Sequence, residues 1–234
     1  MLDWFIGNTP SFTQFLLGGP PSIAWAAAGL FLAGWLKLRR GWPTGYTRKV
    51  FHFFIFGTAA ALQVWKGTPA VCLFGAMTSL LIFYAVFRGE GHPLYEGLAR
   101  EKDAPHRTFY IVSSYFATLA GGIASSMLFE EAALYGFLVT GLADAVAEPV
   151  GTRWGKHPYR VPAFHGLKIE RSLEGSTAVF MFSVLALSVG YGGLLPSMII
   201  VALALTGLEA ISPHGWDNLT LQLGASGLAA VYWT

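Results

Sequence analysis

The stretch T-P-A-V-C-L-F-G-A-M-T-S-L-L-I-F-Y-A-V-F at residues 68–87 contains no charged side chain. About 20 apolar residues in a helix are enough to cross the roughly 30 Å hydrocarbon core of a bilayer. Further apolar runs occupy residues 21–38, 50–65, 108–129, 132–150, 173–190, 195–210 and 218–233. Together these runs predict an all-α, polytopic integral membrane protein, a helical bundle of about eight transmembrane helices.

The composition of the whole chain agrees with a membrane protein. Of its 234 residues, 54% are apolar and 12% are charged, whereas soluble domains carry about 25% charged residues. A soluble single domain cannot bury this much apolar surface, so a soluble globule and a nucleic-acid-binding arm are both excluded. The single cysteine, Cys72, excludes an internal disulfide and a cysteine metal cluster.

The first twenty residues differ from the rest of the chain. They combine aromatic residues with Asn8, Pro10 and two glycines, and they have no basic start of the kind that signal peptides have. We therefore expect residues 1–20 to form an interfacial segment. No long repeat and no linker divides the remainder, so residues 21–234 are predicted to form a single transmembrane domain.

The distribution of charge predicts an orientation. If the apolar runs alternate in direction across the bilayer, all Lys and Arg residues except Lys66 lie in loops on one face. By the positive-inside rule this face is cytoplasmic. All six histidines and most acidic residues lie on the same face, although no topological rule places acids there. We therefore expect a polar site on the cytoplasmic face of an integral membrane protein.

An acidic motif, G-L-A-D-A-V-A-E-P-V-G, ends the fifth apolar run. Asp144 and Glu148 are four residues apart, so on a helix they share one face. Ionised acids near a bilayer repel each other unless a cation lies between them, and Mg²⁺ prefers carboxylate oxygens together with substrate phosphates. Acids at a solvated helix end, neutralised by the basic loop that follows, are the alternative.

Three residues of this motif constrain the backbone. Pro149 removes a helical N–H group, which predicts that the helix bends or ends there. Gly151 and Gly155 have no side chain, so another backbone or a ligand can approach them closely.

A basic loop follows the acidic motif. Its five basic residues are Arg153, Lys156, Arg160, Lys168 and Arg171. The loop ends in K-I-E-R-S-L-E-G-S, where Ser172 is a candidate N-cap, Gly175 admits a ligand to the backbone and Ser176 supplies a hydroxyl. A helix N-terminus beside basic side chains binds phosphate. A merely solvated loop is the alternative, but the acids and this loop together favour a metal–nucleotide site.

Two further polar stretches lie at the same predicted face. R-K-V-F-H contains Arg48, Lys49 and His52, and L-E-A-I-S-P-H-G-W-D-N-L contains Glu209, Ser212, Asp217 and Asn218. Basic anchors that reach the membrane surface would explain the first stretch, and a capped turn between helices would explain the second.

In this order, the four stretches resemble the motifs of the CTP-dependent polyprenol kinase family, which includes dolichol, phytol and farnesol kinases. The acidic motif with its G-x-x-x-G frame is similar to Asp144, Glu148, Gly151 and Gly155. The motif of a basic residue and Ser followed by x-E-G-S resembles Arg171, Ser172, Glu174, Gly175 and Ser176. R-K-x-x-H and E-x-x-S with D-N-L complete the resemblance, which spans residues 46–223.

Three positions depart from the family pattern. Ala143 stands where members often have Gly, Glu148 where many have Asp, and Arg171 where many have Lys. The last two changes keep the charge, so they bear on subfamily and substrate more than on the chemistry.

The resemblance implies a CTP-dependent kinase that uses Mg²⁺ to phosphorylate the hydroxyl of a membrane isoprenoid alcohol: a polyprenol or dolichol, phytol, geranylgeraniol or farnesol. Asp144 and Glu148 would bind the metal, and the residues with a catalytic role would be Asp144, Glu148, Asp217 and His52. The nucleotide would be bound by Arg48, Lys49, Lys156, Lys168, Arg171, Ser172, Glu174, Gly175, Ser176 and Asn218. No nucleic acid partner is expected.

Two other functions compete with a kinase. A CTP:phosphatidate cytidylyltransferase would have a similar acidic motif and basic loop, but its expected C-terminal signature, P-G-H-G-G-x-x-D-R-x-D, is replaced here by Pro213-His214-Gly215-Trp216-Asp217-Asn218. A transporter would place its polar residues near the middle of the bilayer in paired halves, whereas here they gather at one surface.

Overall fold

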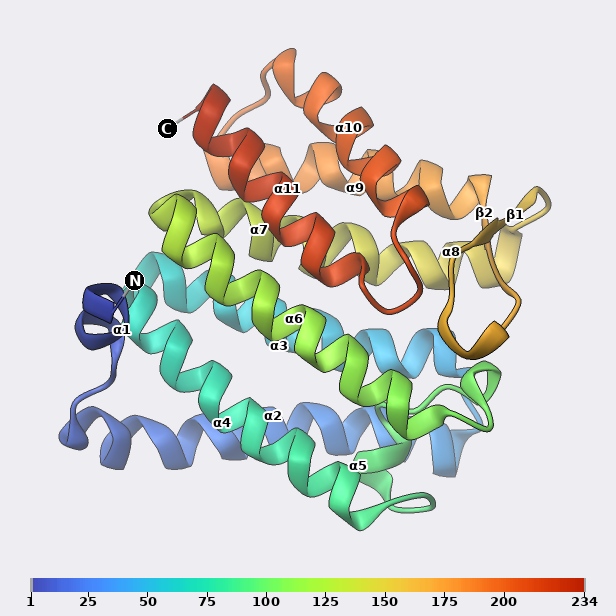
Figure 1. Cartoon of the computed structure of the whole chain (residues 1–234), viewed down its shortest axis with the longest axis horizontal. Coiled ribbons are helices and arrows are strands. Elements are labelled where there is room, and N and C mark those ends of the chain that lie inside the picture. Colours follow the sequence, from blue (N-terminus) through green and yellow to red (C-terminus); the bar gives the residue numbers. More distant parts are fainter. Residues whose placement is uncertain (1, 234) are drawn as a thin grey trace. The chain divides into compact units, whose positions relative to one another are not determined.

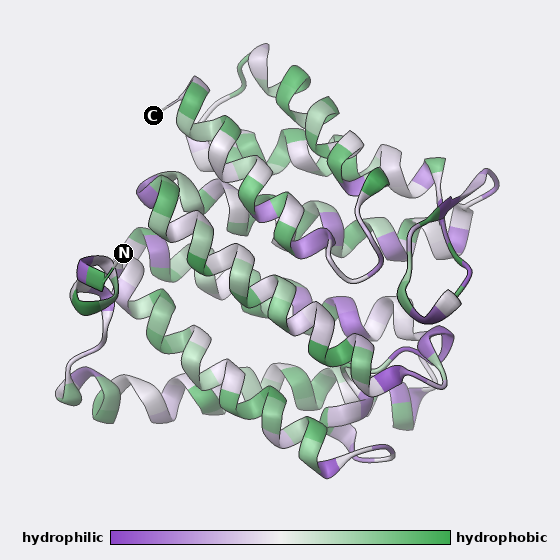
Figure 2. Cartoon of the chain, viewed as in Figure 1, coloured by the Kyte–Doolittle hydropathy of each residue, from purple (hydrophilic) through white to green (hydrophobic). Residues whose placement is uncertain are grey.

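The computed structural model describes residues 2–233. The chain is mostly helical, as predicted, and it divides into two compact units, Met1–Ile111 and Val112–Thr234 (Figure 1). Figure 2 shows that apolar residues run along the helices of each unit, while hydrophilic residues gather toward the ends of helices and in the loops.

The described residues of the first unit form helices and the loops between them. Its elements are α1 (Leu2–Asn8), α2 (Phe12–Arg40), α3 (Thr44–Lys66), α4 (Thr68–Arg88), α5 (Pro93–Glu96), the short 3₁₀ helix η1 (Glu101–Asp103) and the start of α6 (Arg107–Phe129). Because α6 begins in this unit and continues into the second, it links the two.

Helix α2 begins earlier than the apolar run at residues 21–38 suggests. Ser11 caps it, since its hydroxyl accepts a hydrogen bond from Gln14 N and its own N–H donates to the Gln14 side chain. The helix continues through Pro20 and Pro21 although each proline removes an intrahelical hydrogen bond. Most of the second half of the predicted interfacial segment is therefore part of α2.

The second unit adds a small hairpin to its helices. Its elements after α6 are η2 (Glu130–Ala132), α7 (Ala133–Val139), the π-helical turn η3 (Thr140–Asp144), α8 (Ala145–Trp154), β1 (Pro158–Val161), η4 (Phe164–Gly166), β2 (Ile169–Ser172), α9 (Leu173–Tyr191), α10 (Ser197–Ile211) and α11 (Asp217–Tyr232). Strands β1 and β2 pair antiparallel, with Tyr159 opposite Arg171.

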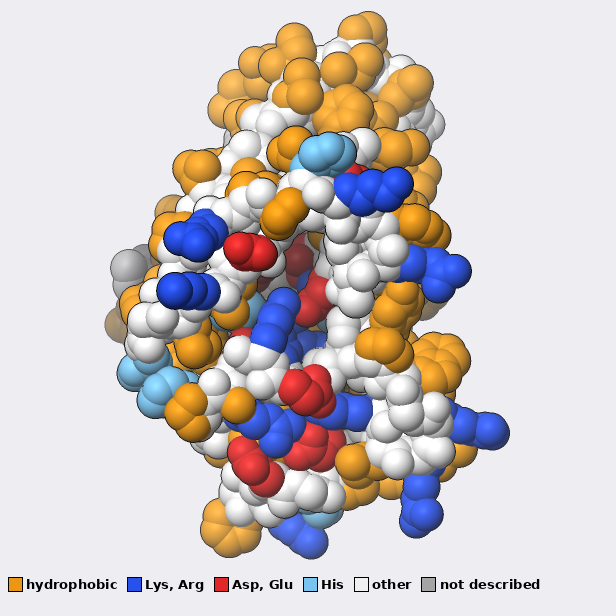
Figure 3. All heavy atoms as spheres, turned by 90° about the vertical axis from the view of Figure 1, so that its right-hand side faces the viewer, with side chains coloured by type: hydrophobic (Ala, Val, Ile, Leu, Met, Phe, Trp, Pro, Cys, Tyr) orange, Lys and Arg blue, Asp and Glu red, His pale blue; other side chains and the backbone are white. Residues whose placement is uncertain are grey.

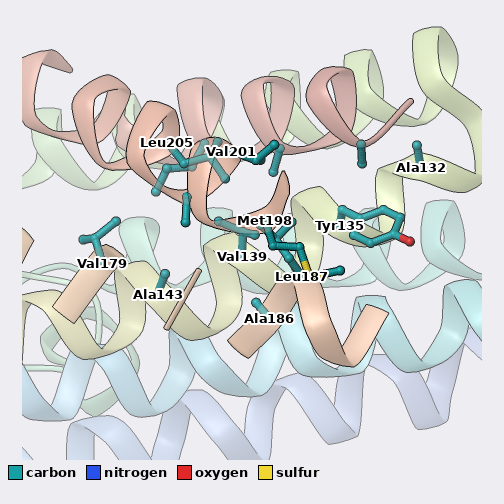
Figure 4. Close-up of a cluster of buried hydrophobic side chains, with 14 of the residues drawn as sticks. Ala132, Tyr135, Val139, Ala143, Val179, Ala186, Leu187, Met198, Val201 and Leu205 are labelled. Atoms are coloured by element: carbon teal, nitrogen blue, oxygen red, sulfur yellow. The ribbon is translucent and has the colours of Figure 1, made fainter. Parts of the chain in front are cut away.

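The core of the second unit lies between α7, α9, α10 and α11. Figure 4 shows buried side chains from these helices pointing toward one another, among them Val139, Leu187, Met198 and Leu205. Each of these four is fully buried. The residues of this cluster are apolar, although a few polar side chains of the same unit, such as Ser183, Gln222 and Ser226, are buried as well.

In the part of the chain that the structure describes, four helical segments are long and apolar enough to cross a membrane: Phe12–Arg40, Thr68–Arg88, Arg107–Trp154 and Leu173–Tyr191. The protein therefore has the character of an integral membrane protein, but the predicted number of about eight spans is not confirmed. The third segment contains two of the predicted runs, and α10 and α11 have only 15 and 16 residues. Those two helices are shorter than the roughly 17 residues that a span needs.

Of the two outcomes expected at Pro149, a bend or an end, the structure excludes the end, because helix α8 continues to Trp154. Within the basic loop, residues 158–161 and 169–172 form the β1–β2 hairpin.

Candidate active site

The two acids of the acidic motif lie at the junction of η3 and α8. Asp144 ends the π-helical turn and is 4% exposed, and Glu148 follows one turn later, half-buried. The backbone is helical from Asp144 into α8, so the two carboxylates share a face as predicted. Single π-helical turns within α-helices are frequent at functional sites, and this one directly precedes α8.

The glycines of the two motifs bring α8 against the start of α9. A Cβ atom on Gly151 would lie 3.1 Å from Ser172 Oγ, and one on Gly155 would lie 2.8 Å from the same oxygen. A Cβ atom on Gly175 would lie 3.1 Å from the carbonyl oxygen of Ala147. What approaches these glycines is therefore the neighbouring element of the chain itself.

Ser172 is the N-cap of α9, as predicted. The backbone N–H of Gly175 donates a hydrogen bond of 3.1 Å to its hydroxyl. Residues of the next turn are tied to the hairpin: Glu174 Oε1 lies 2.7 Å from His157 Nδ1, and Ser176 Oγ lies 2.7 Å from the Tyr159 hydroxyl. The first turn of α9 is thus fixed in place by β1 and by the residue before it.

The sequence motifs did not single out Tyr159 or His157. A signal for the hairpin is present in the sequence. Apolar and polar residues alternate in Y-R-V and in I-E-R, and Gly166 lies in the turn between them. Burial raises the pKa of the Tyr159 phenol, and the nearby Glu209 raises it further. The hydrogen bond with Ser176 and the charge of Arg171 lower this pKa, but the net change is a rise. Tyr159 therefore acts as a neutral hydrogen-bonding group.

Arg171 connects the hairpin to the ends of two helices. Its Nε lies 3.1 Å from Glu209 Oε1 near the end of α10, and its Nη2 donates to Asp217 Oδ2 at 3.0 Å at the start of α11. Its Nη1 also donates to the Glu209 carbonyl oxygen. Three of its five N–H donors are used in this way.

The environment of Arg171 contradicts the alternative of a merely solvated loop at this residue. Its side chain is 14% exposed, and that of Glu209 only 5%. Burial lowers the pKa of Arg171, but Asp217, Glu209 and Asp144 outweigh this and raise it. Three carboxyl groups from different parts of the sequence thus act on one guanidinium group.

Asn218 is directed toward α6. Its Nδ2 donates to Thr118 Oγ1 at 2.6 Å, and Gln222 Nε2, one turn further along α11, donates to the Thr118 carbonyl oxygen at 3.1 Å. Asn218 N also donates to Asp217 Oδ1 at 3.1 Å. The first turns of α11 are therefore anchored, which positions Asp217. Nucleotide binding by Asn218 stays a prediction.

The other predicted residues divide between exposed and buried positions. Lys156 and Lys168 are exposed at the two ends of the hairpin. Arg48, Lys49 and His52 belong to the first two turns of α3 in the first unit, where Lys49 and His52 are each 6% exposed. Their part in the site stays a prediction.

Figure 3 views the end of the helices at which the hairpin lies and shows Lys, Arg, Asp and Glu side chains gathered there. Within residues 2–233, no group of three or more His, Cys, Asp or Glu side chains is arranged to bind a metal ion. A cation held by Asp144 and Glu148 would therefore need further ligands, such as water or phosphate oxygens.

Comparison with known proteins places the chain in a family. No family model matches it, and no solved structure is recognisably similar. It is 32% identical over 195 residues to the phytol kinase of Synechocystis sp., an alignment that covers 80% of this chain and 79% of that protein. Identity at this level along most of both chains shows common descent, and the protein belongs to the family of phytol and polyprenol kinases.

Proposed function

We propose that the protein is a kinase that transfers the terminal phosphoryl group of a nucleoside triphosphate to the hydroxyl of a membrane isoprenoid alcohol. The observation that carries this proposal is the similarity to a phytol kinase along 80% of the chain. The motif resemblance adds CTP as the phosphoryl donor and Mg²⁺ as the metal. Phytol, a polyprenol, geranylgeraniol and farnesol are the acceptors that it implies.

The second unit offers what phosphoryl transfer needs, which is chiefly positioning and stabilisation of charge. Asp144 and Glu148 provide carboxylate oxygens on one helical face, the donor type that Mg²⁺ prefers. A bound Mg²⁺ would neutralise negative charge on the phosphates. The fit of the donor type supports the metal assignment.

The phosphates have basic and N–H donors nearby. Lys156 is exposed at the end of the hairpin from which α9 starts, and Lys168 is exposed at the other end of β2; the first turn of α9 is held by Ser172. Arg171 retains two N–H donors after its bonds to Glu209 and Asp217. We therefore propose that the lysines contact phosphate directly and that Arg171 chiefly holds the acids in place.

The proton of the alcohol has to leave as the new bond forms. Both oxygens of Asp217 are engaged, one with Arg171 and the other with the N–H of Asn218. Asp217 would therefore have to give up one of these contacts before it could accept the proton.

The reaction is tested with purified protein, isotopically labelled triphosphates and a panel of prenols from farnesol to long-chain polyprenols. We expect a prenyl monophosphate and, from CTP, CDP. Release of pyrophosphate with formation of a CDP-lipid would contradict the kinase assignment. Phosphoryl transfer from ATP but not from CTP would contradict the assignment of CTP as the donor.

Asp144→Asn keeps the shape of the side chain but removes its charge. We expect a loss of more than about a hundredfold in turnover, since a charged metal ligand contributes several kcal/mol to the transition state. Glu148→Asp should keep measurable activity and Glu148→Gln should not. Glu170→Gln, which changes an exposed acid on β2, is the matched control and should be fully active. Normal activity and Mg²⁺ dependence in Asp144→Asn would overturn the metal site.

A further inference from the structure

An open cavity of about 660 Å³ lies in the first unit beside the last turns of α2. Its lining combines apolar side chains with two adjacent arginines: Phe31, Trp35, Leu38, Arg39, Arg40 and Pro93. None of these residues belongs to the motifs that the proposed function uses. The volume is in the range of ordinary ligand sites, which is about 300–1,000 Å³.

Close packing of α5 on α2 builds this cavity. A Cβ atom on Gly34 would collide with the carbonyl oxygen of Pro93, and one on Gly97 would lie 2.8 Å from the carbonyl oxygen of Leu30. The two glycines therefore let the start of α5 touch α2 directly. The wall of the cavity is the outer side of α2, because Leu30, Ala33 and Gly34 face inward and are buried.

The apolar wall belongs to a surface that meets lipid. Phe31 is 53% exposed and Leu38 is 46% exposed. Both lie on Phe12–Arg40, one of the segments that can cross a membrane. An exposed aromatic and an exposed leucine on such a helix contact acyl chains, so the cavity is open to a molecule that arrives from the bilayer.

The charges at the end of this wall are uncompensated. Arg39 and Arg40 are exposed, and neither has an ion-pair partner among residues 2–233, whereas Lys37 in the same turn binds Glu96 and Glu101 at 2.9 and 2.7 Å. The guanidinium carbon of Arg40 lies 5.1 Å from the centre of the Trp35 ring. Two neighbouring guanidinium groups without an anion are complementary to a phosphate, which they can bind in a bidentate manner.

We propose that this cavity binds an anionic phospholipid of the surrounding membrane. The phosphate lies between Arg39 and Arg40, and one acyl chain follows Phe31, Trp35 and Leu38 toward the bilayer. The exposed apolar side chains of Phe31 and Leu38, on a segment that can cross a membrane, favour a ligand with an acyl chain over a water-soluble nucleotide. The proposal does not depend on the kinase reaction.

The test measures lipid binding to the purified full-length protein in detergent by native mass spectrometry, with phosphatidylglycerol and phosphatidylcholine titrated separately. We expect phosphatidylglycerol to bind and to raise the melting temperature, and phosphatidylcholine to do neither. Inorganic phosphate and glycerol phosphate serve as headgroup-only probes and should bind far more weakly, because they lack the acyl chain.

The variant Arg39→Gln/Arg40→Gln should weaken phosphatidylglycerol binding about thirtyfold, as expected for two basic groups near a membrane surface. The matched control is Arg88→Gln/Arg153→Gln, which removes two exposed arginines that also stack on aromatic rings, at 5.8 and 5.4 Å from the ring centres. The control should bind phosphatidylglycerol like the unaltered protein.

A second variant keeps both arginines. Leu38→Glu places a carboxylate beside them at a position that is 46% exposed, so the fold is expected to tolerate it, and it should reduce phosphatidylglycerol binding to a similar degree. Equal binding of the two lipids, normal phosphatidylglycerol binding by either variant, or an equal loss in the control would each overturn the proposal.

Discussion

At the scale of single residues, Arg171 positions two acidic side chains of the second unit. It reaches from β2 to Glu209 and Asp217, which belong to different helices. A lysine has one nitrogen on a flexible stem and cannot bridge two carboxylates with the fixed geometry of a guanidinium group. The departure from the family pattern at this position therefore has a structural use in this chain.

Arg171→Ala should destabilise the protein, because it leaves a buried carboxylate and Asp217 without their counter-charge. Breaking a buried pair from one side costs about 3–5 kcal/mol, so a large fall in melting temperature is expected, with loss of activity. Arg171→Lys should recover part of the stability. Adding Glu209→Gln to Arg171→Ala removes the uncompensated charge and should raise the melting temperature again.

The measurement is thermal unfolding of all four proteins in one detergent, together with prenol phosphorylation. If Arg171→Ala melts like the unaltered protein and the second substitution adds nothing, the ion pairs seen here do not stabilise the fold. In that case the role assigned to Arg171 would again be direct contact with phosphate, as the sequence predicts.

For the candidate site, local backbone features were predictable from the sequence, whereas long-range contacts between side chains were not. The i, i+4 spacing of Asp144 and Glu148 and the N-cap role of Ser172 follow from local rules, and the structure agrees with both. The contacts of Arg171 join residues about 40 positions apart, and no local pattern encodes such a distance. Burial of Arg171 could not be inferred for the same reason.

At the scale of elements, glycines set how closely the helices of the second unit approach. A Cβ atom on Gly136 of α7 would collide with Ser226 Oγ and lie 2.7 Å from the Gln222 carbonyl oxygen of α11. A Cβ atom on Gly207 of α10 would have no other atom within 4 Å. The two glycines are both helical, but only the first is required by packing.

Gly136→Ala should therefore lower stability by about 1–3 kcal/mol through overpacking. Gly207→Ala should leave stability unchanged or raise it by up to about 1 kcal/mol, because alanine is the better helix former. Chemical unfolding of both variants in the same detergent checks this. A Gly136→Ala protein as stable as Gly207→Ala would mean that α7 and α11 are not packed as described.

The end of α2, α5 and the start of α6 are joined by buried charges. Glu96 accepts from Lys37 at 2.9 Å and from Arg107 at 2.6 Å. Burial alone would raise the pKa of Glu96, but the hydrogen bonds of Arg107, Lys37 and the Gly91 N–H lower it from 4.5 to about 2. Protonation of Glu96 would cancel these bonds.

Because the pKa of Glu96 is lowered on folding, its contribution to stability is complete above about pH 4.5 and disappears as the pH falls toward 2. The shift corresponds to at most about 3 kcal/mol. Glu96→Gln should melt well below the unaltered protein at pH 7, and the difference should shrink as the pH falls. Exposed Glu131→Gln is the control. A difference that stays constant down to pH 3 would contradict the linkage.

Long elements were predictable and short ones were not. Apolar runs of about 20 residues identified the helices, because a chain that crosses a bilayer needs about this many apolar residues and has to satisfy its backbone hydrogen bonds within the helix. Each strand of the β1–β2 hairpin has only four residues and lies in a basic loop, where charge obscures the alternation. The continuation of α8 past Pro149 could not be predicted, because a proline costs a hydrogen bond that packing against α9 compensates.

At the scale of the whole molecule, the charge distribution along the chain carries the prediction of orientation. Every Lys and Arg except Lys66 precedes or follows an apolar run on the side that alternation assigns to one face. Within residues 2–233, four segments meet the criteria for a membrane span by length and composition, so the alternation itself has to be measured. The positive-inside rule predicts that the basic face is cytoplasmic.

Single cysteines introduced at exposed positions can report that orientation in intact cells. In a background with Cys72→Ser, Lys102→Cys and Arg160→Cys belong to the basic loops and are exposed, while Leu194→Cys lies in the loop between α9 and α10 and is 70% exposed. An impermeant maleimide added outside should label Leu194→Cys alone, and should label all three after the cells are opened. Alternation across eight spans requires Lys102 and Arg160 to behave alike, so labelling of just one of them from outside would show that an odd number of crossings separates the two loops. Labelling of both from outside, with Leu194→Cys protected, would invert the orientation and place the Asp144 site on the exterior face.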